Sequence, residues 1–114
     1  MPGLGARCVD DHPWVTGAET CELALALAAA GQPDAALEQV AAMQHLREDD
    51  GSYWTGYVYP DDARWPVERT TWTAAAVVLA ADALSGATPA SGLFTEPAAL
   101  PLAGTSDDEA PVRP

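Results

Sequence analysis

Two copies of an acidic–aromatic pattern lie 51 residues apart, and each is followed by an alanine-rich apolar segment. The copies read DDHPW at residues 10–14 and DDARW at residues 61–65, and the alanine-rich segments begin at Thr20 and Thr71. A period of this length is typical of repeat architectures, in which each unit buries its apolar face only against its neighbours. The spacing therefore predicts somewhat under two units of a helical-hairpin repeat.

The pattern predicts three helices, over residues 18–30, 35–47 and 69–84. Thr16 and Glu19 have the spacing of a capping box at the start of the first helix, and Gly31 is a typical stop at its end. Ser85 and Gly86 stop the third. The first and third helices are apolar on nearly all sides, so we expect both to be buried on two faces. The second is amphipathic.

Residues 48–68 join the second and third helices, and the aromatic content of this segment indicates order rather than disorder. From residue 87 onward Pro, Gly and acidic residues predict a disordered tail, with Leu93 and Phe94 able to dock back. The predicted fold class is all-α: a buried helix, an amphipathic helix, a long ordered loop and a second buried helix.

The composition disfavours several classes of partner. Seventeen acidic residues against five arginines give a net charge of -12, which opposes binding to nucleic acids and to anionic membrane surfaces. No apolar stretch reaches the ~20 residues needed to cross a bilayer, and no signal peptide is visible, so we expect a cytoplasmic protein. Cys8, His12 and Cys21 lack the spacing of a zinc site, so no metal-ligating set is predicted.

Three stretches resemble the prenyltransferase and squalene-cyclase repeat, the unit of the α/α toroid. They are Gln44, DGSYW at residues 50–54 and ERTTWTAA at residues 68–75. The resemblance covers residues 14–86 and implies a partial module, the C-terminal portion of a longer toroid. Residues 1–13 would then be a lead-in segment and residues 87–114 a flexible tail. It also implies that the first and third helices line a central cavity and that the second lies outside.

By this resemblance the chain is a prenyltransferase- or terpene-cyclase-like module that acts on an isoprenoid diphosphate, with Mg²⁺ as cofactor if the diphosphate is bound. The catalytic candidates are Asp61 or Asp62 as acid or metal ligand, with Glu68 and Arg69 at the start of the third helix. A structural alternative stays open for each, because Asp is favoured in turns and Glu68 can pair locally with Arg69.

Aromatic side chains supply the predicted substrate-binding residues, which are Trp54, Tyr57, Tyr59, Trp65 and Trp72. Ordinary packing between hairpins is the alternative explanation for them. Paired carboxylates beside Trp and Tyr suit a glycan-active enzyme equally well, so a sugar is the alternative to a small hydrophobic substrate. A third reading is a non-catalytic scaffold, which would associate with itself through its open helical edge.

Overall fold

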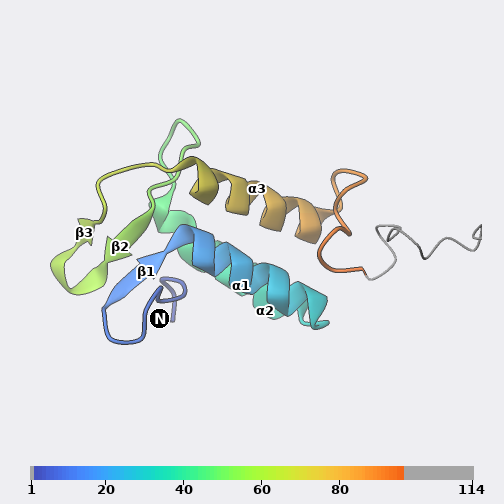
Figure 1. The fold of residues 1–114 in the computed structure, drawn as a ribbon, viewed down its shortest axis with the longest axis horizontal. Coiled ribbons are helices and arrows are strands. Elements are labelled where there is room, and N and C mark those ends of the chain that lie inside the picture. Colours follow the sequence, from blue (N-terminus) through green and yellow to red (C-terminus); the bar gives the residue numbers. More distant parts are fainter. Residues whose placement is uncertain (1, 97–114) are drawn as a thin grey trace, which may run out of the picture.

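The computed structural model describes residues 2–96, in which three helices lie side by side and a small sheet covers one end of them (Figure 1). The helices are α1 (Gly17–Ala29), α2 (Pro33–Ala42) and α3 (Thr71–Ser85), and the strands are β1 (Trp14–Thr16), β2 (Gly56–Val58) and β3 (Ala63–Arg64). Two short 3₁₀ helices, η1 (Met43–Leu46) and η2 (Tyr59–Asp61), complete the set of elements.

The helices follow the stop signals of the sequence. Gly31 and Gly86 lie just beyond α1 and α3 with φ of 77° and 67°, the left-handed region that glycine adopts without strain. The predicted second helix divides in two, because the chain tightens into η1 and thereby buries Met43 and Leu46. The predicted capping box is wrong: the Thr16 hydroxyl makes no cap hydrogen bond.

The sheet makes the all-α prediction wrong, and the fold is a small mixed α/β arrangement. Its order is β1-β2-β3, antiparallel throughout, so β2 lies between segments that are far apart in the sequence. Trp14 pairs with Val58, and Tyr57 pairs with Arg64. The strands have three, three and two residues. Such short strands carry too few positions for an alternating pattern to be recognised in the sequence.

The core lies where α1 packs against both α2 and α3. Its buried residues are mostly small, which lets the helices approach closely; they are Ala18, Cys21, Met43, Leu46, Ala76 and Ala80. Gly17 begins α1 at a crowded point, since a Cβ there would lie 3.0 Å from both Met43 and Thr73. The Gly17 amide donates to the Thr55 carbonyl, and the Thr55 hydroxyl lies 3.0 Å from that of Thr70. Thr55 therefore holds the N-terminal ends of α1 and α3 together.

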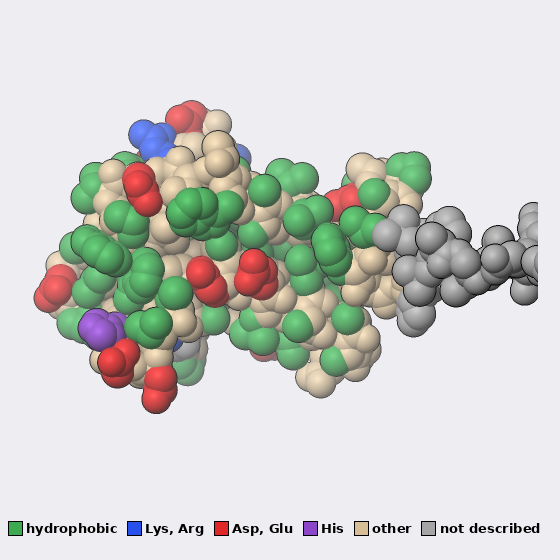
Figure 2. Space-filling view, viewed as in Figure 1, with side chains coloured by type: hydrophobic (Ala, Val, Ile, Leu, Met, Phe, Trp, Pro, Cys, Tyr) green, Lys and Arg blue, Asp and Glu red, His purple; other side chains and the backbone are tan. Residues whose placement is uncertain are grey.

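The other face of α1 and α3 is open, in contrast to the predicted burial on two faces. Trp72 and Val78 are 61% and 65% exposed. A groove of about 460 Å³ runs between the two helices and is lined mainly by alanine and leucine, with Trp72 and Phe94 beside them. Figure 2 shows hydrophobic side chains along both helices on the visible face. Self-association through this face stays a prediction, which the particle mass in solution tests.

After α3 the described chain continues in turns, held by the Thr88 amide and hydroxyl, which donate to the Asp82 carboxylate at 2.9 and 2.7 Å. The rest of the predicted tail, residues 97–114, lies outside the described residues. Within the described range no helix is long and apolar enough to cross a membrane.

Candidate functional site

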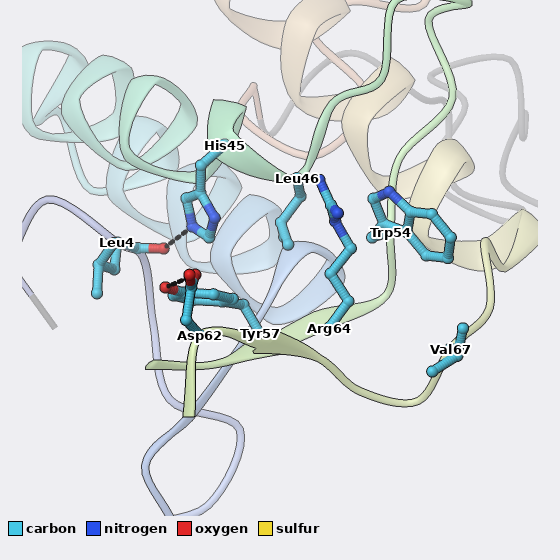
Figure 3. Close-up of a pocket in the computed structure, with 8 residues that line it drawn as sticks. All are labelled: Leu4, His45, Leu46, Trp54, Tyr57, Asp62, Arg64 and Val67. Atoms are coloured by element: carbon cyan, nitrogen blue, oxygen red, sulfur yellow. Dashed lines mark hydrogen bonds between the residues drawn. The ribbon is translucent and has the colours of Figure 1, made fainter. Parts of the chain in front are cut away.

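A cleft of about 450 Å³ opens at the sheet end of the molecule (Figure 3). Strands β2 and β3 form one wall, and η1 with the segment after it forms the other. The lining of the cleft includes one carboxylate, one imidazole, one guanidinium and two aromatic rings. Its lining residues are Leu4, His45, Leu46, Trp54, Tyr57, Asp62, Arg64 and Val67.

Asp62 and Tyr57 form the polar pair on the strand side of the cleft. Asp62 has a φ of 48°, a left-handed conformation that Asp tolerates, at the turn between β2 and β3. The Tyr57 hydroxyl donates to Asp62 Oδ1 at 2.9 Å. This hydrogen bond, helped by burial and by the negative charge, raises the pKa of Tyr57. Tyr57 therefore stays protonated at neutral pH and keeps the Asp62 carboxylate in position.

The Tyr57 ring is held from its other side by His45, at 5.1 Å between ring centroids and in an edge-on arrangement. His45 Nε2 in turn donates to the Leu4 carbonyl at 2.9 Å. The N-terminal segment thereby holds the His45 ring in place, and the His45 ring packs against the Tyr57 ring. Figure 3 shows both hydrogen bonds at the same side of the cleft.

Trp54 lies at the opposite side, surrounded by charge. The guanidinium carbons of Arg64 and Arg69 lie 5.1 and 4.7 Å from its ring centroid, within cation–π range. The Trp54 indole donates to Glu48, and Glu48 also pairs with Arg64 at 3.0 Å. The ring is therefore engaged by arginines rather than left free for stacking, and Arg64 reaches both the ring and the acid.

The four predicted catalytic residues occupy different places. Asp62 lines the cleft, whereas Asp61 is exposed in η2 and is not one of the lining residues. Arg69 donates to Ser52 at 2.8 Å and pairs with Asp50 at 3.3 Å, and it is not one of the residues that line the cleft. Glu68 is exposed, and its backbone carbonyl accepts from Thr55. The structure thus brings Asp62 alone of the four into the cleft.

The predicted substrate-binding aromatics are divided as well. Trp54 and Tyr57 line the cleft, and Tyr59 lies in η2. Trp65 lines a separate hollow beside Trp14, and Trp72 lines the α1–α3 groove. They do not form one pocket, because the sheet and α3 carry them to different surfaces.

Sequence reasoning missed three polar residues: His45 and Arg64, which line the cleft, and Glu48, which pairs with Arg64. Arg64 lies inside the second acidic–aromatic copy, directly before Trp65, and this position in the motif could have marked it as a candidate site residue. Glu48 and His45 carry no local signal, because they reach the site only through the fold. In the described part of the chain no group of three or more His, Cys, Asp or Glu residues is arranged to hold a metal ion.

The residues that carried the toroid resemblance form a local turn. Asp50 Oδ1 accepts from the Ser52 amide at 2.9 Å and from the Ser52 hydroxyl. These bonds are the main reason that the pKa of Asp50 is lowered. Gln44 accepts from the Tyr53 hydroxyl at 2.9 Å and closes the turn. Turn chemistry of this kind occurs in many folds and does not identify one.

No protein-family model matches the chain. The chain is similar to the MMP endo-(1,4)-3-O-methyl-alpha-D-mannosidase of Mycolicibacterium hassiacum, at 71% identity over 94 residues. The match covers 82% of this chain and 26% of the mannosidase, so the chain spans about a quarter of that relative's length. The finding overturns the resemblance to prenyltransferases and squalene cyclases: the similar protein carries the name of a glycosidase.

Proposed function

We propose that the chain is part of a glycan-active hydrolase and that its cleft binds an α-mannoside unit. The observation that carries the proposal is the 71% identity to a mannosidase over 82% of the chain. The isoprenoid-diphosphate hypothesis has no comparable support and is abandoned. Because the match covers only 26% of the relative, the proposal concerns the binding of sugar at this cleft and not the whole reaction of that enzyme.

The chemistry of the cleft suits a neutral polyol. Asp62 offers acceptor oxygens, Arg64 offers donors, and the Tyr57 hydroxyl beside Asp62 can exchange its bond with a sugar hydroxyl. A volume of about 450 Å³ falls in the range of small-molecule sites. Leu4, Leu46 and Val67 supply apolar contact for the C–H face of a sugar ring.

Asp62, which lines the cleft, and Glu48, which contacts its Trp54 and Arg64, are not equivalent. Glu48 is held by Trp54 and Arg64, and this fits a positioning role. Asp62 accepts a hydrogen bond from the neutral Tyr57 hydroxyl, so Asp62 is the carboxylate that is available to a ligand. Glycoside hydrolysis uses carboxyl groups as acid, base or nucleophile. We therefore assign to Asp62 the direct contact with the sugar, and to Tyr57 the positioning of its carboxylate.

The test is the affinity of the chain for a 3-O-methylated α-1,4-manno-oligosaccharide, measured by isothermal titration calorimetry. Asp62→Asn should weaken binding by about tenfold or more, because a hydrogen bond to a charged group contributes about 1.5–3 kcal/mol. Asn is tolerated at the left-handed φ of this position, so the backbone is kept. The matched control is Asp61→Asn, which removes the same charge from the adjacent exposed residue and should leave the affinity unchanged. Equal losses in both variants, or no binding to the wild-type chain, would contradict the proposal.

A scaffold role is the second candidate. The observation that favours it is the exposed apolar face of α1 and α3, on which Trp72 and Val78 are more than half exposed. Alanine and leucine on neighbouring helices are suited to packing against further protein. This role and the sugar cleft use different surfaces, so one does not exclude the other.

A further inference from the structure

The sheet has a second face, on the side opposite the cleft. Successive residues of a strand point to opposite sides, so Tyr57 and its partner Arg64 face the cleft while Val58 and its partner Trp14 face away from it. Trp65, the residue after β3, turns to the same side as Trp14. Both copies of the acidic–aromatic pattern therefore deliver their tryptophan to this outer face.

These residues enclose a hollow of about 500 Å³ that shares no residue with the cleft. We call it the tryptophan shelf. It is mainly apolar, with one imidazole, and is lined by Val9, His12, Pro13, Trp14, Val58 and Trp65. Trp65 is 56% exposed and Val9 is 41% exposed. Core packing does not account for an indole this exposed beside a second one.

The shelf is rigid. The Trp14 and Trp65 rings meet edge-on with centroids 5.0 Å apart, and Trp14 Nε1 donates to the Trp65 carbonyl at 2.7 Å. Gly56 makes this approach possible, since a Cβ there would collide with the Trp14 indole and would lie 2.8 Å from the Val15 carbonyl. A held aromatic surface can bind a ligand without the cost of ordering it.

We propose that the tryptophan shelf is a second sugar-binding surface, which takes an O-methylated α-mannoside unit of the same glycan. The inference rests on the proposed function. A sugar presents C–H bonds to an indole face, and a methyl ether enlarges that apolar surface and removes a hydroxyl donor. The net charge of -12 disfavours an anionic ligand. His12 donates through Nδ1 to Asp11 at 2.7 Å, so its Nε2 is the ring nitrogen that can meet a sugar hydroxyl.

The name of the similar mannosidase describes an endo-acting enzyme on a 3-O-methylated glycan. An endo-acting enzyme cleaves within a chain, so its substrate has sugar units beyond the point of cleavage that a remote surface can bind. Two contacts on one glycan raise its overall affinity through effective concentration. The shelf would then select the methylated sugar while the cleft holds the hydroxyl groups.

Trp72 provides an internal comparison. It is as exposed as Trp65, at 61% against 56%, but the α1–α3 groove around it is built from helical alanine and leucine, with Glu22 as its charged residue. That surface suits a packing helix rather than a sugar. Trp72 is therefore the matched control for a ligand that stacks on an exposed indole.

The experiment is a titration of the ¹⁵N-labelled full chain with methyl 3-O-methyl-α-mannoside and, in parallel, with methyl α-mannoside. The indole N–H signals of Trp14 and Trp65 should shift more with the methylated sugar, and the Trp72 signal should not shift. Trp65→Ala should weaken binding of the methylated sugar by about three- to tenfold, because an aromatic contact contributes about 0.5–1.5 kcal/mol. Trp65→Phe should fall between the two, and Trp72→Ala should bind as the wild type does.

The outcomes separate the two proposals. If the manno-oligosaccharide binds in an Asp62-dependent way but the Trp14 and Trp65 signals do not move, the shelf is overturned and the cleft stands. If the shelf signals move and Asp62→Asn has no effect, the shelf stands and the cleft assignment fails. Absence of any binding overturns both. The Trp65 backbone bonds to Trp14 and Gly56 do not need the side chain, so Trp65→Ala should keep its fold, which circular dichroism checks.

Discussion

The two copies of the acidic–aromatic pattern share three letters, the two aspartates and the tryptophan, but their side chains make different contacts. In the first copy Asp11 pairs with the adjacent His12, and Asp10 pairs with Arg7, three residues away. In the second copy Asp62 takes a left-handed conformation and accepts from Tyr57 across the β2–β3 turn. The tryptophans of both copies meet on the outer face of the sheet. Both copies therefore supply a tryptophan that packs on the sheet, whereas only the second copy supplies a carboxylate that lines the cleft.

The largest effect is expected where the two copies meet, at Gly56. Gly56→Ala should lower the free energy of unfolding by about 2–3 kcal/mol, because the new Cβ collides with the Trp14 indole and with two backbone carbonyls. Chemical denaturation followed by tryptophan fluorescence measures the change. The control is Gly86→Ala, where a Cβ meets nothing within 4 Å. Only the positive φ of this position disfavours alanine, so the free energy of unfolding should fall by about 1 kcal/mol. Equal effects at the two glycines would show that the copies do not depend on close contact.

The tryptophans of the two copies should differ in their contribution to stability. Trp14→Ala removes a half-buried ring and its hydrogen bond to Trp65, and it should cost about 2–3 kcal/mol. Trp65→Ala removes a more exposed ring and leaves the backbone bonds in place, so it should cost about 1 kcal/mol or less. Denaturant midpoints of the two variants compare them directly. If Trp65→Ala is less stable than Trp14→Ala, the claim that Trp14 contributes more to folding than Trp65 is wrong.

The smallest effects concern pH, and the two copies should respond at opposite ends of the scale. The hydrogen bond from His12 lowers the pKa of Asp11, so its stabilising effect is present above the usual value of 3.8 and is lost as pH falls through the lowered value. The bond to Asp62 raises the pKa of Tyr57 above 10.0, so that effect is present below pH 10.0 and is lost as pH rises through the raised value.

These titrations can be followed one residue at a time. In Asp62→Asn the Tyr57 ring signal should titrate at lower pH than in the wild type, because the hydrogen bond to a carboxylate is lost and the charge that opposes ionisation is gone. In His12→Ala the Asp11 carboxyl signal should titrate at higher pH. Unchanged titration of Tyr57 in Asp62→Asn would mean that the two side chains do not share a hydrogen bond in solution.

The sequence allowed the helices to be predicted but not the sheet. Runs of alanine with glycine stops at Gly31 and Gly86 are local signals, and the helices they predict are present. The pairing of β1 with β2 is decided by contacts between distant segments, such as Trp14 with Val58, and strands of two or three residues leave no local trace. The resemblance to a toroid failed for a related reason: the turn around Asp50 and Ser52 satisfies itself locally and carries little information on the fold.

The site was predictable in part. The identity of Trp54, Tyr57 and Asp62 as candidate residues came from composition and from the repeated motif, and these three line the cleft. The joining of Glu48 with Arg64, and of His45 with Tyr57, depends on how η1 meets the sheet, which no short pattern encodes. Trp65 and Trp72 were assigned to one pocket because spacing along the chain does not reveal which face of a sheet or helix a residue will occupy.

The most direct test of the account compares one carboxylate from each copy for its effect on sugar binding. Asp10 and Asp62 are both exposed, but Asp62 lines the cleft and Asp10 does not. Asp10→Asn and Asp62→Asn therefore remove the same charge from one position outside the cleft and one within it. Affinity for the 3-O-methylated α-1,4-manno-oligosaccharide, measured by calorimetry on both variants, should fall about tenfold or more in Asp62→Asn and stay at the wild-type value in Asp10→Asn. Equal affinities in the two variants would contradict the claim that the second copy alone carries the chemistry.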